Sequence, residues 1–278
     1  MSAWAARACA VLAVAAVGLG AAPASAQTSD LVSETRFRVC ADPANLPFSH
    51  QDGSGFENKI ADLIAAKLER PVEYTWFPQA LGFVRRTLRE NRCDVIIGFA
   101  QGHELVLNTN HYYTSSYVFV TKPGSDLAGV DHIGDPVLKG RRIGVVAGSP
   151  PATHMARAGL IGDAKGYRLM VDRRIDDPTV QMIADLKSGE IDAAVLWGPI
   201  GGVFGKREGL LVTPLLKEEG APRLFYRITM GVRQGELQWK RELNKLIRRN
   251  QKDIDAILAE YGVPLLDEQG KALKVLSE

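Results

Sequence analysis

The stretch that decides the fold occupies residues 36–68 and reads RFRVCADPANLPFSHQDGSGFENKIADLIAAKL. Its first five residues are typical of a short β-strand, and the prolines that follow exclude a helix over residues 42–49. A helix is then predicted, because Ser54-Gly55-Phe56-Glu57 fits a capping box and apolar residues recur at helical spacing over residues 60–68. Ligands of open α/β sheets bind at the carboxyl ends of strands, so the loop between strand and helix is the predicted wall of a binding site.

The first 26 residues are predicted to be a secretory signal peptide that the mature protein lacks. Arg7 precedes an apolar run at residues 8–19, and Ala24-Ser25-Ala26 forms a small-residue cleavage pattern. The cleavage site carries no cysteine for a lipid anchor, and no later apolar run is long enough to span a membrane. We therefore expect a soluble periplasmic protein without a membrane anchor.

The whole chain has 278 residues and a formal net charge of +2. The part after the signal peptide is long enough for two ordinary domains with hydrophobic cores of their own. Its basic residues are scattered through predicted helices, and doublets such as Arg248-Arg249 are interpreted as solvated helix faces. This distribution argues against nucleic acid as a partner, and a monomer is expected.

The sequence beyond residue 68 predicts two similar α/β units. Strand patterns at residues 72–77 and 93–98, with a short helix between them, complete a β-α-β-α-β order, which is the right-handed doubly wound plan. A second unit starts with the strand pattern at residues 141–147 and reaches another buried strand at residues 191–196. The second unit therefore repeats the plan of the first.

The repeat is also visible in the letters of the sequence. TLRENRCDV at residues 87–95 parallels DLKSGEIDA at residues 185–193. Each segment is a helix end, a polar turn and an aspartate, Asp94 or Asp192, that enters an apolar strand.

Two β-rich runs flank the second unit, YYTSSYVFVT at residues 112–121 and LFYRITMGVR at residues 224–233. Two crossing strands return the chain to the first lobe, where one long helix over residues 237–261, ended by Gly262, is expected to pack. The predicted fold class is α/β, with two doubly wound lobes joined by two crossing hinge strands. The expected boundaries are residues 27–121 with 225–278 for lobe one, and residues 122–224 for lobe two.

Two cysteines remain in the mature chain, Cys40 and Cys93, and an oxidising compartment favours a disulfide between them. The predicted topology argues the other way. Cys40 ends its strand whereas Cys93 begins one, so in parallel strands the two sulfurs would lie at opposite ends of the sheet. The sequence leaves both alternatives open.

This organisation resembles the type II periplasmic-binding-protein fold. Within that superfamily the wording is closest to the periplasmic J-proteins (the MxaJ/MoxJ/XoxJ group), also called quinoprotein dehydrogenase-associated substrate-binding proteins. The resemblance rests on RVCADPANLPFS, GFENKIA, EYTWFPQ, GFVRRTL, TNHYYTSSYVFV, IDAAVLWGPIGG and YGVPLLDEQG, and it covers nearly the whole mature chain. It implies a PQQ-dependent methanol or alcohol dehydrogenase as the partner.

The chain departs from ordinary amino-acid receptors of the same superfamily. In those receptors an arginine after the third strand and an aspartate after the last lobe-two strand pair with the charges of the ligand. Here the two regions read GFAQGHE at residues 98–104 and LWGP at residues 196–199. We therefore expect no affinity for standard amino acids.

Eight residues fall at predicted carboxyl ends of strands and are the candidates for a cleft that binds a small ligand or a protein segment. They are Asp42, Phe48, Trp76, Phe77, Phe99, His103, Ser149 and Trp197. For Phe77 and Phe99 the alternative is packing in a lobe core. For Asp42 it is a turn in which the side chain caps its own backbone. The segment around Ser149 precedes a helix and could bind an anion there.

Catalytic and metal motifs are missing from the sequence. There is no HExxH, no GxSxG and no Cys-rich metal spacing, so no catalytic residue, metal or cofactor site is assigned. The leading hypothesis is a non-enzymatic periplasmic accessory protein of a PQQ-dependent dehydrogenase. The alternatives are a small-molecule receptor of an ABC importer and, third, a dehydratase built on this fold.

Overall fold

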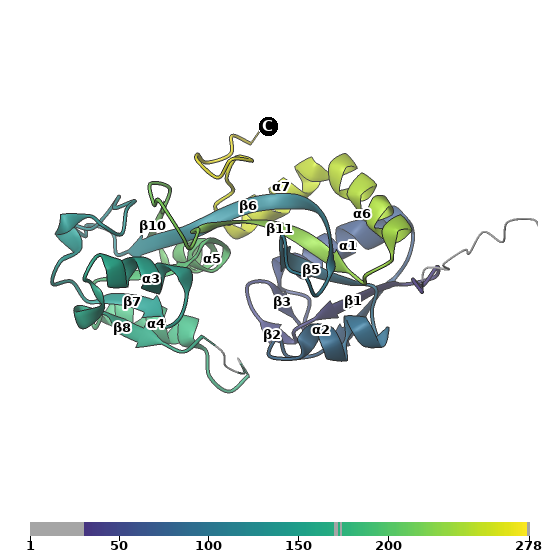
Figure 1. Ribbon diagram of the computed structural model, residues 1–278, viewed down its shortest axis with the longest axis horizontal. Helices are drawn as coiled ribbons and strands as arrows, with labels where there is room; N and C mark the ends of the chain where they lie inside the picture. Colours follow the sequence, from purple (N-terminus) through teal and green to yellow (C-terminus); the bar gives the residue numbers. More distant parts are fainter. Residues whose placement is uncertain (1–30, 170–171, 173, 277–278) are drawn as a thin grey trace, which may run out of the picture.

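The computed structural model describes residues 31–169, 172 and 174–276. The predicted signal peptide lies outside these residues. Within them, no helix is long and apolar enough to cross a membrane. Figure 1 shows two α/β units bridged by the long strand β6 (Leu107–Thr121).

The first unit is built on three parallel strands, in which β1 (Phe37–Ala41) lies between β4 (Val72–Trp76) and β5 (Val95–Ala100). Helix α1 (Phe56–Leu68) packs its apolar side in one core with these strands. The loop after β1 forms a small antiparallel hairpin from β2 (Ala44–Asn45) and β3 (Ser49–His50). The predicted β-α-β order of this part is confirmed.

Helix α1 begins differently from the predicted capping box. Gly55, not Ser54, is its capping residue, and Oδ1 of Asn58 accepts the Gly55 N–H at 3.1 Å. The same oxygen accepts the His50 N–H at 3.0 Å, which ties the helix start to the hairpin. The predicted capping role of Glu57 is therefore wrong, because Asn58 performs it.

Strand β6 pairs with strands of both units. Its first part pairs antiparallel with β11 (Phe225–Val232), which also pairs with β5. Its last part pairs antiparallel with β9 (Ala193–Trp197) and with β10 (Leu211–Pro214). The sheet therefore continues from one unit into the other in the order β4-β1-β5-β11-β6-β9-β7-β8.

The second unit repeats the parallel plan, with β7 (Ile143–Val146) between β9 and β8 (Lys165–Tyr167). Three helices cover its strands: α3 (Pro150–Arg157), α4 (Pro178–Ser188) and α5 (Gly198–Glu208). Met155 of α3 packs in one core cluster, and Met182 of α4 packs with Phe204 of α5 in another. Helix α5 and strand β10 have no counterpart in the sequence prediction.

The chain after β11 packs on the first unit. Helices α6 (Leu237–Arg249) and α7 (Gln251–Tyr261) share the α1 core through Trp239, Leu243, Ile254 and Leu258. The single long helix predicted for this segment is wrong, because Asn250 interrupts it and donates its side-chain N–H to the Leu246 carbonyl at 2.8 Å. The division of the chain into lobes at residues 122 and 224 stays a prediction.

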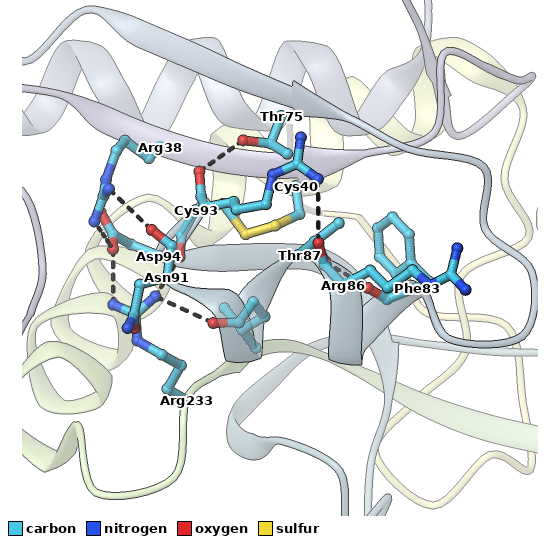
Figure 2. The surroundings of a disulfide bond; sticks show 12 residues. Arg38, Cys40, Thr75, Phe83, Arg86, Thr87, Asn91, Cys93, Asp94 and Arg233 are labelled. Carbon is cyan, nitrogen blue, oxygen red and sulfur yellow. Dashed lines mark hydrogen bonds and ion pairs between the residues drawn. A yellow bond between two sulfur atoms is a disulfide. The ribbon is translucent and has the colours of Figure 1, made fainter.

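Cys40 and Cys93 form a disulfide, with their Cα atoms 5.5 Å apart (Figure 2). The topological argument against this bond was wrong. Strand β5 starts at Val95, and Cys40 pairs with Ile96, only three residues beyond Cys93. Because the strands are so short, a cysteine in the turn before β5 still lies within reach of the neighbouring strand. The bond closes a loop with a sequence separation of 53 residues.

Candidate functional site

Two of the candidate residues, Phe48 and Trp197, lie where the cores of the two units meet. Each packs against the α1 core and also against the α4–α5 core. The Trp197 ring stands edge-on to Tyr117 of β6 at 5.4 Å and to Tyr226 of β11 at 5.7 Å. We call Phe48, Tyr117, Trp197 and Tyr226 the aromatic junction.

The local sequence fixes the position of each ring in the aromatic junction. Trp197 ends β9 and caps α5, whose first residues, Gly198 and Pro199, are both buried. A Cβ at Gly198 would overlap the Ser116 carbonyl, so glycine lets α5 start directly against β6. Burial raises the pKa of the Tyr117 hydroxyl and of the Tyr226 hydroxyl. Both side chains therefore stay neutral and contribute apolar ring surface with a polar tip.

Phe99 and His103 lie together at a second place, beside α2 (Phe83–Arg86). They line a pocket of about 360 Å³ with Leu81, Arg85 and other residues of the α2 region. The His103 ring meets Phe99 edge-on at 5.2 Å, and Leu81 is 89% exposed. This pocket is an apolar surface with a basic rim, separate from the aromatic junction.

Phe77 belongs to the packing of the same region. Its ring lies 6.4 Å from Phe83, and it packs with Phe99 against the core cluster that contains the disulfide. This is the lobe-core role that the sequence offered as the alternative for Phe77.

Asp42 holds two loops together and uses both carboxylate oxygens to do so. Oδ1 accepts the Ala44 N–H at 2.8 Å, and Oδ2 accepts the Gln79 N–H at 2.5 Å. Asn45 adds a bond from Nδ2 to Oε1 of Gln79 at 2.7 Å. This is the turn role that the sequence offered as the alternative, and it positions the segment that presents Leu81.

Trp76 stacks on Tyr74 at the edge strand β4, with ring centroids 4.4 Å apart and planes 17° from parallel. Both rings pack on the α1 core. Burial raises the pKa of the Tyr74 hydroxyl to about 12. Trp76 therefore reaches the same core as Trp197 but from a different strand, and no ring contact joins the two tryptophans among the described residues.

Ser149 caps α3 and is buried, and its hydroxyl has no hydrogen-bond partner among the described residues. The next two residues, Pro150 and Pro151, carry no N–H. An anion at this helix start would lose two of the amide donors that usually hold it. The structure therefore weakens the anion-binding interpretation of Ser149.

Glu57 is a residue that the sequence analysis missed as a functional candidate. Its half-buried carboxyl forms no ion pair with any described residue, and it lies so close to Gly98 that a Cβ there would overlap it. Gly98 also has a φ of 82°, which other residues rarely adopt. Burial raises the pKa of Glu57 well above its usual value. Burial also raises the pKa of the Tyr112 and Tyr113 hydroxyls, and the negative charge of Glu57 adds to both shifts.

The sequence contains a signal for this contact that the sequence analysis did not use. A glycine inside an apolar strand indicates that something approaches the backbone closely, and here that group is the Glu57 carboxyl. In the part of the chain that the structure describes, no group of three His, Cys, Asp or Glu side chains is placed to hold a metal ion.

The two doubly wound units and the two crossing strands are those of the type II periplasmic binding proteins. The crystal structure of periplasmic binding protein XoxJ from Methylobacterium extorquens AM1 has a TM-score of 0.72 and 43% identity, over 84% of this chain and 100% of that one. The crystal structure of MxaJ from Methlophaga aminisulfidivorans MPT has a TM-score of 0.73 and 26% identity, over 83% and 100%.

The sequence comparisons agree with this class. Protein MoxJ of Methylorubrum extorquens is 31% identical over 272 residues, which cover 88% of this chain and 89% of that protein. Residues 37–264 match the bacterial extracellular solute-binding proteins, family 3. The chain belongs to this family.

Proposed function

We propose that this protein is a non-enzymatic periplasmic accessory protein of a PQQ-dependent alcohol dehydrogenase, and that its aromatic junction binds a segment of that enzyme. The choice of partner rests on the resemblance to the J-proteins and on the relatives named MoxJ, XoxJ and MxaJ. The membership of a binding-protein family supports a binding role over a catalytic one.

One observation carries the proposal: the Trp197 ring contacts the rings of Tyr117 and Tyr226, and Trp197 and Phe48 each pack against the cores of both units. Protein interfaces use such rings as anchors, because they bury a large apolar area at a small cost in side-chain entropy. A site for a small solute instead converges a few polar groups on a small volume. Amino-acid receptors carry their charge clamps after the strands that correspond to β5 and β9. In this chain, residues 98–104 and 196–199 contain no arginine and no aspartate.

The test is capture of the purified dehydrogenase by variants of this protein. Trp197→Ala is expected to weaken binding by about 2 kcal/mol, or roughly 30-fold, because a central aromatic anchor is lost. Trp76→Ala is expected to weaken it by a similar amount if the segment extends along β4. Leu237→Ala is the control, since this side chain is 53% exposed on α6, outside the aromatic junction.

Trp197→Phe keeps an aromatic ring against both cores and separates a loss of binding from a loss of folding. Circular dichroism and thermal melts are compared for all variants before capture is measured. If the folded Trp76→Ala/Trp197→Ala double variant captures the dehydrogenase as well as the wild type, neither tryptophan takes part and the proposal fails.

The second candidate is a solute receptor of an ABC importer, which the family supports directly. Calorimetry against the twenty standard amino acids separates the two functions. We expect no heat of binding, whereas a micromolar dissociation constant, equal to about 8 kcal/mol, would favour the receptor. Steady turnover of a substrate by the pure protein would favour an enzyme of the dehydratase type.

A further inference from the structure

A basic groove lies between the end of α1 and the outer side of α6. Its volume is about 680 Å³. Figure 1 places α6 on the side of the first unit that faces away from α3 and α4. Five cations line the groove, namely Lys67, Arg70, Arg241, Lys245 and Arg249.

The three cations on α6 form one stripe. Arg241, Lys245 and Arg249 are four residues apart, so they share one side of the helix and follow one another about every 6 Å. The core is reached from another side of the helix, by Trp239, Leu243 and Ile247. The three exposed cations are therefore not needed for packing. Arg248 and Arg249 lie exposed on α6, as the sequence interpretation of a solvated helix face expects, and the fold also brings Arg249 near the end of α1.

The cations of the basic groove are not neutralised within the protein. None of the five forms an ion pair with a described residue, although Glu69 and Glu242 line the same groove. Within the described part of the chain, Arg70 is the one of the five whose side chain has a hydrogen bond, to the Ser33 carbonyl at 3.0 Å. Like charges four residues apart on a helix repel one another. This arrangement weakens the fold slightly and leaves a positive surface ready for an anionic partner.

We propose that the basic groove docks an extended segment of a partner protein that carries acidic side chains at every second position. Alternate residues of an extended chain project to the same side about every 6.6 Å, which matches the spacing of the α6 cations. Arginine and lysine side chains bind carboxylates through charge-assisted hydrogen bonds. The inference is independent of the dehydrogenase proposal, because it rests on a different surface of the first unit.

The shape of the groove argues against the other anions. The three α6 cations follow one another along about 12 Å of helix, so they suit a row of negative groups better than one phosphate. A membrane presents a flat layer of negative charge. A concave groove lined by Glu69 and Glu242 fits such a layer poorly in shape and in charge. These two carboxylates also favour a partner whose charges are spaced rather than continuous, because they repel a continuous row of negative groups.

The experiment uses a fluorescein-labelled peptide of four Glu-Ser repeats and the full mature protein in 20 mM salt. We expect measurable binding that weakens at least tenfold in 200 mM salt, since exposed charge contacts are screened. A peptide of four Gln-Ser repeats is the control probe and is expected not to bind. Failure of the Glu-Ser peptide to bind at millimolar concentration overturns the proposal.

The variant Arg241→Glu/Lys245→Glu/Arg249→Glu is expected to lose at least tenfold in affinity for the Glu-Ser peptide. Its control carries the same change in charge at three exposed cations elsewhere, Lys139→Glu/Arg168→Glu/Lys271→Glu. Equal weakening by both variants would mean that only the net charge matters and would overturn the site.

Vesicles of phosphatidylglycerol are the third probe. If they retain the wild type and release the Arg241→Glu/Lys245→Glu/Arg249→Glu variant while the peptide does not bind, the groove is a lipid-binding surface and the proposal is wrong. The fold of both triple variants is checked by thermal melts. If a triple variant does not fold, variants with one charge reversed at a time are used in its place.

Discussion

Glu57 places a carboxyl group where water can solvate it only in part. The start of α1 favours a negative charge there, yet burial outweighs this effect, because the pKa of Glu57 is raised well above its usual value. A carboxyl whose pKa is raised in the folded state binds its proton more tightly than in the unfolded chain. It therefore adds to stability at low pH, and this contribution is lost as the pH rises through the folded-state pKa.

Glu57→Gln should consequently stabilise the protein at pH 8 by about 1 to 3 kcal/mol and change little at pH 4.5. Other titrating groups are common to both proteins, so their effects cancel in the difference. Urea denaturation at the two pH values measures it. A difference that is the same at both pH values, or larger at pH 4.5, would show that the Glu57 carboxyl is not desolvated.

The sequence was least informative about the contacts that individual side chains make. Asp42 and Glu57 are both acidic residues near the predicted binding loop. Nothing in their spacing shows that Asp42 uses both oxygens on backbone N–H groups whereas Glu57 forms no ion pair with a described residue. The difference depends on Gln79 and Gly98, which the fold brings in from other elements. Side-chain roles of this kind are set by tertiary contacts rather than by local pattern.

At the scale of elements, the internal repeat has a structural explanation. The N–H of Asp94 bonds to the Arg38 carbonyl at 2.8 Å, and the N–H of Asp192 bonds to the Arg142 carbonyl at 2.8 Å. Each aspartate then pairs through its side chain with that same arginine. The repeated aspartate therefore anchors the start of a central strand to the neighbouring strand in each unit.

The two aspartates differ in burial. The Asp94 side chain is 1% exposed and also binds Arg233 at 2.8 Å, which in turn pairs with Glu236 (Figure 2 shows Arg38, Asp94 and Arg233). The Asp192 side chain is 28% exposed, and among the described residues it forms an ion pair with Arg142 only. The first pair belongs to a buried network, whereas the second is close to a surface ion pair.

Asp94→Ala is therefore expected to destabilise the protein by about 3 to 5 kcal/mol, because it breaks a buried ion-pair network, leaving Arg38 without its carboxylate and Arg233 with Glu236 as its remaining anion. Asp192→Ala is the matched control, with an expected cost of about 1 kcal/mol or less. Chemical denaturation of the two variants gives both values. Equal costs would contradict the assignment of a buried network to the first unit alone.

Several elements were predictable because their patterns are periodic and bounded. The apolar run that became β5 and the glycine that ends α7 are examples. The break between α6 and α7 was not, since a lone asparagine is compatible with a helix interior until its side chain competes for the Leu246 carbonyl. The disulfide was misjudged because strand length, which decides the distance, was not part of the topological argument.

At the scale of the whole molecule, the two units are joined by contacts between α5 and the end of α7 as well as by the shared strand β6. Gly202 of α5 lies so close to Gly262 that a Cβ would overlap the Gly262 carbonyl. Oγ of Ser115 donates to the Pro264 carbonyl at 2.7 Å, and Nζ of Lys206 donates to the Glu260 carbonyl at 2.5 Å. Gly202 and Lys206 of α5 therefore contact the end of α7, so the second unit meets the first here as well as through β6.

The overall plan was predictable from order and repeat, but the aromatic junction was predictable only in part. Phe48 and Trp197 were candidates because they follow strands, whereas Tyr117 and Tyr226 lie inside the crossing strands and carried no such signal. Their role depends on how β6 and β11 run between the units. No local pattern contains that information.

The most direct test of the central claim is hydrogen–deuterium exchange of this protein with and without the dehydrogenase. The informative amides are those of residues 44–50, which contain Phe48, and of the first turn of α5, which follows Trp197. N–H groups in a first helical turn have no intrahelical partner and exchange quickly. We expect at least tenfold slower exchange in both segments when the dehydrogenase is bound. Unchanged exchange there, with protection confined to α6 or to other outer surfaces, would contradict it.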